Sequence, residues 1–137
     1  MLDYRRVLPL LAVIDETVVG TATLHDDLSP GREHIRAVRI VVDPAQRNQG
    51  LGRFLLKRLV DIAKREDKRL EKVVLEVVAD AEHAAQRAAR AVGFVPVSDL
   101  SAYVRYYGGK PHDVILLEVP VHAPAFTEPD EPAAHMF

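Results

Sequence analysis

The sequence contains no cysteine, which excludes disulfide bridges, cysteine-ligated zinc and a thiol nucleophile. It also lacks an excess of charge of one sign. The formal net charge is −2, which does not favour binding to nucleic acid or to an anionic membrane. No apolar run approaches the ~20 residues of a membrane span, and the N-terminal segment has no small-residue cleavage site. With 137 residues, 48% of them hydrophobic, we expect one domain in the cytoplasm.

The first part of the chain has the pattern of three strands. Apolar and β-branched residues fill 8–14 and 17–24, and the pair Asp15-Glu16 between them predicts a hairpin turn. A third such run covers 35–42 and ends before Pro44, which cannot donate a hydrogen bond to a neighbouring strand. These strands should be antiparallel neighbours.

Helical spacing begins after the third strand. Apolar residues recur at that spacing between 50 and 68, with charged residues on the opposite side, and an alanine-rich helix is expected at 81–92 before Gly93. The rest of the pattern predicts strands at 73–78, 94–97 and 114–121, a loop at 98–112, and a proline-containing acidic tail at 122–137. We therefore expect a domain over 1–121 with a mixed α/β sheet, in the order β-β-β-α-β-α-β-β, and a right-handed parallel crossover between 35 and 78.

The segment Val42-Asp43-Pro44-Ala45-Gln46-Arg47-Asn48-Gln49-Gly50-Leu51-Gly52 joins a strand to a helix. A helix N-terminus presents unpaired backbone N–H groups and the positive end of the helix dipole. Two glycines allow a ligand to approach the backbone closely, and Arg47 adds positive charge. These features favour an anion site suited to a pyrophosphate. The alternative is a structural glycine-rich turn that binds nothing.

The motif V-x-P-x-x-R-x-x-G-x-G at 42–52 resembles the acetyl-CoA turn of the GNAT N-acetyltransferase superfamily. The similarity continues downstream in Leu75-Glu76-Val77, Ala85-Gln86-Arg87, Gly93-Phe94, and in Tyr103, Gly109 and His112-Asp113. It covers about 10–121. The resemblance implies the GNAT fold and transfer of an acetyl group from acetyl-CoA, as co-substrate and without a metal, to a primary amine.

The resemblance also implies where the cofactor binds. Two neighbouring strands of this family splay apart, and the pantetheine arm lies in the gap between them. By this analogy 40–42 contact pantetheine, 47–53 hold the pyrophosphate, and the backbone N–H of Val42 stabilises the oxyanion. The implied cofactor residues are Ile40, Val41, Val42, Arg47, Asn48, Gln49, Gly50, Leu51, Gly52 and Arg53.

A general base is needed because most amines are protonated at pH 7. Glu76 is the leading candidate, since it interrupts an apolar strand and matches the family's base on that strand. If the strand is buried, desolvation would raise the pKa of Glu76; if the strands splay, Glu76 faces water or pairs with an arginine. His34 is a second candidate for the base; the alternative interpretation is that it is a solvated loop residue without a catalytic role. Arg36 stands where many relatives carry a carboxylate.

Two positions depart from the family pattern. The resemblance implies an asparagine near the start of the last helix and a tyrosine one turn before Gly-Phe, where this chain has Glu82 and Ala89. Alanine cannot protonate the departing thiolate, so Tyr103 is a candidate acid, with Tyr106, Tyr107 and water as alternatives. Each of these tyrosines is otherwise a packing residue or part of the acceptor loop.

These departures leave an alternative function open, namely a non-catalytic acyl-CoA-binding module. The acceptor amine, whether a small molecule, a peptide or a protein, is not identified by the sequence. Only 1–7 precede the first strand, whereas the family usually has a further strand and helices there. We therefore expect an open acceptor groove, or a groove covered by the tail or by a second copy, and favour a homodimer.

Overall fold

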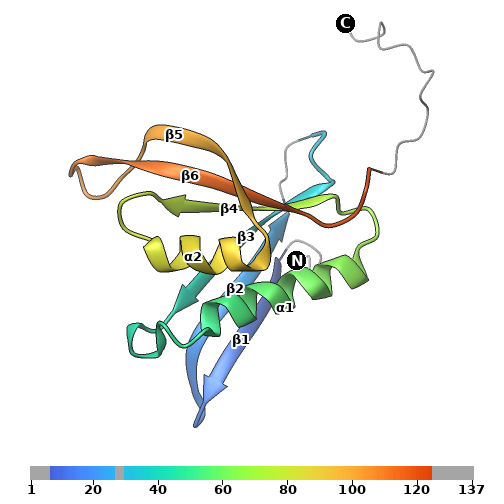
Figure 1. The fold of residues 1–137 in the computed structure, drawn as a ribbon, viewed down its shortest axis with the longest axis horizontal. Helices are drawn as coiled ribbons and strands as arrows, with labels where there is room; N and C mark the ends of the chain where they lie inside the picture. Colours follow the sequence, from blue (N-terminus) through green and yellow to red (C-terminus); the bar gives the residue numbers. More distant parts are fainter. Residues whose placement is uncertain (1–6, 27–29, 125–137) are drawn as a thin grey trace, which may run out of the picture.

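The computed structural model describes residues 7–26 and 30–124, and these form one six-stranded mixed sheet with helices packed on it (Figure 1). The elements are β1 (Val7–Ile14), β2 (Thr17–Asp26), β3 (Ile35–Val42), the 3-10 turn η1 (Pro44–Gln46), α1 (Leu51–Glu66), β4 (Lys72–Val78), α2 (His83–Val92), β5 (Val95–Arg105) and β6 (Pro111–Pro120). The strands lie side by side in the order β1-β2-β3-β4-β6-β5. The predicted element order and mixed α/β class are confirmed.

The hairpin between β1 and β2 forms where the sequence predicted it. Asp15 and Glu16 have φ values of +49° and +66°, and the flanking residues Ile14 and Thr17 pair with each other. Positive φ at both central residues is the turn geometry that matches the twist of the two strands.

The core lies between the sheet and the two helices. The apolar side of α1 buries Leu55, Leu56, Leu59 and Ala63, and α2 buries Ala89 against the same cluster. Gly20 on β2 faces α1, where an added Cβ would lie 3.0 Å from Leu55 Cδ1. The missing side chain therefore lets α1 pack closely on the sheet. Neither helix is long and apolar enough to span a bilayer.

The segment after α2 differs from the prediction. A short strand at 94–97 and a loop at 98–112 were expected, whereas β5 continues to Arg105, which pairs with Pro111 of β6. The pairing is irregular between Leu100 and Val104, where Ala102 has a φ of +51°. Almost every β5 side chain is exposed, so this edge strand lacks the apolar alternation by which a strand is recognised.

The feature that positions the site is a divergence between β3 and β4. These strands pair in parallel, as predicted, but only from Ile35–Lys72 to Val38–Leu75. Beyond that point β3 stays paired with β2, and β4 stays paired with β6. The two halves of the sheet therefore separate and leave a gap between the ends of β3 and β4.

The described chain continues past β6 as far as 124. Val121 is buried, and its N–H donates to the Glu71 carbonyl at 2.8 Å. The ring of His122 contacts the Lys64 carbonyl at 2.9 Å. The remainder of the expected tail, 125–137, lies outside the described residues.

Candidate functional site

The turn between β3 and α1 has an open helix N-terminus. Asp43 closes η1 by accepting a hydrogen bond from the Ala45 N–H at 2.9 Å. Asn48 and Gly50 then adopt positive φ values of +64° and +79°, and Gly50 stands at the N-cap without a side-chain hydrogen bond to the helix. The first backbone N–H groups of α1 are therefore left for solvent or a ligand, at the positive end of the helix dipole.

A groove of about 600 Å³, called here the helix groove, lies over this turn. Its lining includes every predicted cofactor residue except Gln49, namely Ile40, Val41, Val42, Arg47, Asn48, Gly50, Leu51, Gly52 and Arg53. The opposite wall is α2, which contributes a stripe of alanines together with Glu82 and Arg87. Small side chains on this wall leave room for a ligand between α2 and β3.

Gly52 contributes directly to this space. A Cβ at this position would lie 3.5 Å from Ile40 Cδ1 and 3.8 Å from Ala88 Cβ, which are ordinary contact distances. A side chain could therefore be accommodated, but it would occupy the groove between β3 and α2.

The edge of β3 at this groove has backbone groups that no strand pairs. The Asp43 N–H donates to the Val19 carbonyl on β2 at 2.8 Å. Backbone groups alternate in direction along a strand, so those of Ile40 and Val42 point toward the gap beside β4. The Arg47 Nε–H donates to the Val42 carbonyl at 3.3 Å, which places the arginine at the mouth of this gap.

A second groove of about 470 Å³, the strand groove, occupies the gap between β3 and β4. Glu76 lines it, but the side chain is exposed. Of the two alternatives that the sequence left open for this side chain, the structure shows the exposed carboxylate and not the buried one. Glu76 alternates with Leu75 and Val77, which are buried in the core cluster, so its carboxylate lies on the opposite face of β4, where solvent reaches it.

The two grooves meet. Ile40, Val41, Glu82 and Ala85 line both of them. One continuous path therefore runs from the N-terminus of α1, along the free edge of β3, to Glu76.

His34 and Tyr103 are not brought to this path. His34 precedes β3 at the closed end of the splay, where its carbonyl accepts from the N–H groups of Glu71 and Lys72 at 2.8 and 3.3 Å. Arg36 lies at the same end and forms ion pairs with Asp26 at 2.9 Å and Asp67 at 3.1 Å. Tyr103 is exposed on β5 and lines neither groove, whereas Tyr106 lines the strand groove.

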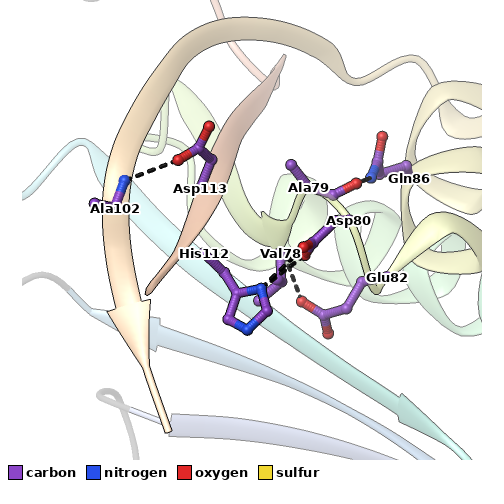
Figure 2. Close-up of polar contacts among 8 residues, drawn as sticks. All are labelled: Val78, Ala79, Asp80, Glu82, Gln86, Ala102, His112 and Asp113. Carbon is purple, nitrogen blue, oxygen red and sulfur yellow. Dashed lines mark hydrogen bonds and ion pairs between the residues drawn. The ribbon is translucent and has the colours of Figure 1, made fainter. Parts of the chain in front are cut away.

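Sequence reasoning missed a polar cluster where β4 ends (Figure 2). The Val78 N–H donates to Glu82 Oε1 at 2.6 Å, which ties the start of α2 to β4. His112 Nδ1 lies 2.9 and 3.0 Å from the two carboxylate oxygens of Asp80. Hydrogen bonding to His112 is the main cause that lowers the pKa of Asp80 below its ordinary value. The sequence signal was the His112-Asp113 pair, but nothing in it connects these residues to Asp80.

The described residues contain no group of three or more histidine, cysteine, aspartate or glutamate side chains that could hold a metal ion. The site is built from backbone groups, the three arginines of the helix groove, Arg47, Arg53 and Arg87, and isolated carboxylates. Such a set suits binding of an anionic ligand and proton transfer.

Comparisons with known structures give the same fold. The chain is similar to yncA of Salmonella typhimurium, an acetyltransferase structure containing acetyl-CoA, with 23% identity and a TM-score of 0.78 over 88% of this chain and 68% of that chain. A GNAT-family acetyltransferase from Streptococcus pneumoniae has 25% identity and a TM-score of 0.76, over 85% and 68%. The ribosomal-protein-S18-alanine N-acetyltransferase of Escherichia coli has 23% identity and a TM-score of 0.69, over 93% and 75%.

No curated protein sequence matches the chain. The family model of the acetyltransferase (GNAT) family, in contrast, matches residues 1–94, from before the first strand to the end of the second helix. This match includes the turn between β3 and α1, both helices and Glu76. The chain belongs to the acetyltransferase (GNAT) family.

Proposed function

We propose that this protein transfers the acetyl group of acetyl-CoA to a primary amine. The observation that carries the proposal is the continuous path from the open N-terminus of α1 to Glu76. Acetyl-CoA is bound in the similar yncA structure, and a similar Escherichia coli protein acetylates an alanine amine of a ribosomal protein. Both support an acyl donor and an amine acceptor for this chain.

In this proposal the pyrophosphate lies over the first turn of α1, beside Arg47. The pantetheine arm follows the edge of β3, where the backbone groups of Ile40 and Val42 face the gap and can pair with its amides. Its length then carries the thioester into the strand groove near Glu76. Gly52 and the alanines of α2 leave the space that the arm needs.

The chemistry needs an oxyanion donor and a proton acceptor. The amine nitrogen attacks the thioester carbonyl, a C–N bond forms, and the C–S bond breaks to release coenzyme A. We assign the Val42 N–H as donor to the oxyanion, because the direction of its backbone groups favours this role. Glu76 is the proposed proton acceptor, and its negative charge also attracts the acceptor ammonium.

A second candidate is a non-catalytic acyl-CoA-binding module. The residue Ala89 favours this alternative. It is 0% exposed, and it stands where the family resemblance implies a tyrosine that acts as the general acid. A thiolate with a pKa of about 8.5 is a fair leaving group without a donor, so the absence of tyrosine does not rule out transfer. The two candidates differ in one measurable respect, which is the release of free thiol.

Thiol release from acetyl-CoA, measured over a panel of primary amines, tests the proposal. Acetyl transfer predicts release that depends on an amine. Glu76→Gln should lower kcat by about 10²–10⁴-fold, because a general base is removed, and leave acetyl-CoA affinity nearly unchanged.

The matched control is Glu66→Gln, which neutralises an exposed carboxylate near the far end of α1. Full activity of Glu76→Gln would contradict its role as base. Tight acetyl-CoA binding without turnover of any amine would favour the binding module.

We further propose that the protein acts in the cytoplasm as a homodimer. The exposed apolar side chains of β1 support self-association.

A further inference from the structure

The Asp80–His112 pair has the geometry of an oriented imidazole. Both oxygens of Asp80 lie within 3.0 Å of Nδ1, so the N–H at Nδ1 donates to the carboxylate and fixes the ring. This arrangement leaves Nε2 as the nitrogen that can accept a proton. Within the described chain, Nε2 makes no hydrogen bond, and the His112 side chain is 26% exposed.

His112 lies beside residues at the rim of the strand groove. It pairs with Val104, and its ring is 6.1 Å from that of Tyr106; both Val104 and Tyr106 line the groove. Along β6 the side chains alternate between faces, so His112 shares the helix-free face with Leu116, which pairs with Glu76. The imidazole and Glu76 therefore border the same open face of the sheet.

The charged groups around His112 come from several elements. Asp80 belongs to the loop after β4, Glu82 begins α2, and Lys110 acts on Asp80 from the turn before β6. Tyr106 is the titratable group on the β5 side. Asp113, next to His112, is turned toward β5 and accepts the Ala102 N–H at 2.8 Å (Figure 2). Asp80 is thus the carboxylate that orients the ring.

Acetylation removes two protons from an ammonium nitrogen. The first must leave before attack, because an ammonium has no lone pair; for a lysine-type amine with a pKa near 10.4, only about one molecule in a few thousand is neutral at pH 7. The second leaves after the C–N bond has formed. The exposed Glu76, between the diverging strands, can accept one of these protons. The other proton needs a second acceptor, which can lie at the rim of the groove.

We propose that His112, held by Asp80, takes the first proton from the acceptor ammonium at the rim of the strand groove. This inference rests on the proposed acetyl transfer. The amine then attacks the thioester, its second proton passes to Glu76, the C–S bond breaks and the thiolate takes a proton from water. His112 and Glu76 both return their protons to solvent, and one of these two protons offsets the proton that the thiolate takes up. The net reaction therefore converts ammonium and acetyl-CoA into amide, thiol and one released proton. Asp80 acts as a positioning residue.

The test is the pH dependence of kcat/KM for His112→Gln, measured by thiol release with the amine probe that turns over fastest. Loss of the entrance base should lower kcat/KM about 10²-fold at pH 7. The deficit should shrink as the pH approaches the pKa of the probe, because a neutral amine needs no deprotonation. Glu76→Gln should show no such recovery. Asp80→Asn should lower kcat/KM, but the ascending limb of the pH profile of kcat/KM should remain, since the imidazole is still present.

The controls are His34→Gln and His122→Gln, which make the same substitution away from the groove and should leave the pH profile unchanged. A His112→Gln deficit that is equal at every pH, or no deficit, would overturn this inference while transfer itself continues. Acetyl-CoA binding without turnover of any probe would instead overturn both the transferase proposal and this inference.

Discussion

Ala89 shows how one residue changes the chemistry that the family resemblance implies. It is fully buried on the side of α2 that faces the core, and its carbonyl accepts the Phe94 N–H at 2.9 Å. The position therefore serves packing in this chain. Any acid that protonates the thiolate must come from another element or from water.

We predict that Ala89→Tyr destabilises the fold and does not restore a catalytic acid. A phenol ring forced into a packed core costs about 1–3 kcal/mol in free energy of unfolding. Chemical denaturation should show a lower midpoint than the native protein. Unchanged stability together with a higher kcat would contradict this prediction and would mean that the ring reaches the thiolate.

Some residues of the candidate site could be predicted from the sequence and others could not. The turn residues around Gly50 and Gly52 could be located because a strand end, two glycines and an arginine lie next to each other. The exposure of Glu76 stayed open, because the apolar run around it does not alternate and so does not show which face of the strand the helices cover. The Asp80–His112 contact joins residues 32 positions apart, and no periodicity marks it.

At the scale of elements, the start of α1 combines structural and binding demands. Gly50 has a φ of +79°, which a side chain would strain. Gly52, in contrast, lies in the first turn of the helix at ordinary φ, where glycine is a poor helix former. Its presence is therefore explained by the space that it leaves in the helix groove.

We predict that Gly52→Ala stabilises the protein and weakens acetyl-CoA binding. Alanine favours a helix interior by up to about 1 kcal/mol over glycine, an upper bound for this first-turn position. The added methyl group fills space between Ile40 and Ala88. Thermal unfolding should show a higher Tm, and calorimetry a lower affinity. A higher Tm with unchanged affinity would mean that the cofactor does not pass this residue.

Secondary-structure prediction succeeded for the elements that bury apolar side chains in the core. The hairpin, β3, β4 and both helices follow apolar periodicity, because each packs one face against the core or is covered on both. The full length of β5 was not predicted, since it is an edge strand that is exposed along nearly its whole length. Its polar and glycine-containing surroundings are typical of a loop, and only its pairing with β6 makes it a strand.

At the scale of the whole molecule, the sheet has a helix-covered face and an open face. Leu8, Leu10 and Ala12 pack against the core, so alternation places Leu11 and Val13 on the open face, where each is 55% exposed. Val41 is exposed on the same face, near the strand groove. Exposed apolar side chains at the edge of a sheet favour self-association, in which a second copy of the chain covers them.

We predict that the native protein sediments as a dimer at tens of micromolar and that Leu11→Lys shifts it to monomer. The lysine places a charge in the proposed interface, while the exposed position tolerates it in the folded chain. Val97→Lys, a matched change on the exposed opposite edge strand β5, should leave the dimer intact. A monomeric native protein would contradict the prediction.

Titration of acetyl-CoA into the native protein by calorimetry tests the central claim most directly, with Arg47→Ala and Arg58→Ala measured alongside. Both variants remove one exposed arginine, but only Arg47 lines the helix groove. A charge-assisted contact to phosphate is worth about 1.5–3 kcal/mol, so Arg47→Ala should weaken binding by about tenfold or more. Arg58→Ala should bind like the native protein. No binding to the native protein, or equal affinity in all three, would contradict the claim that this groove holds the cofactor.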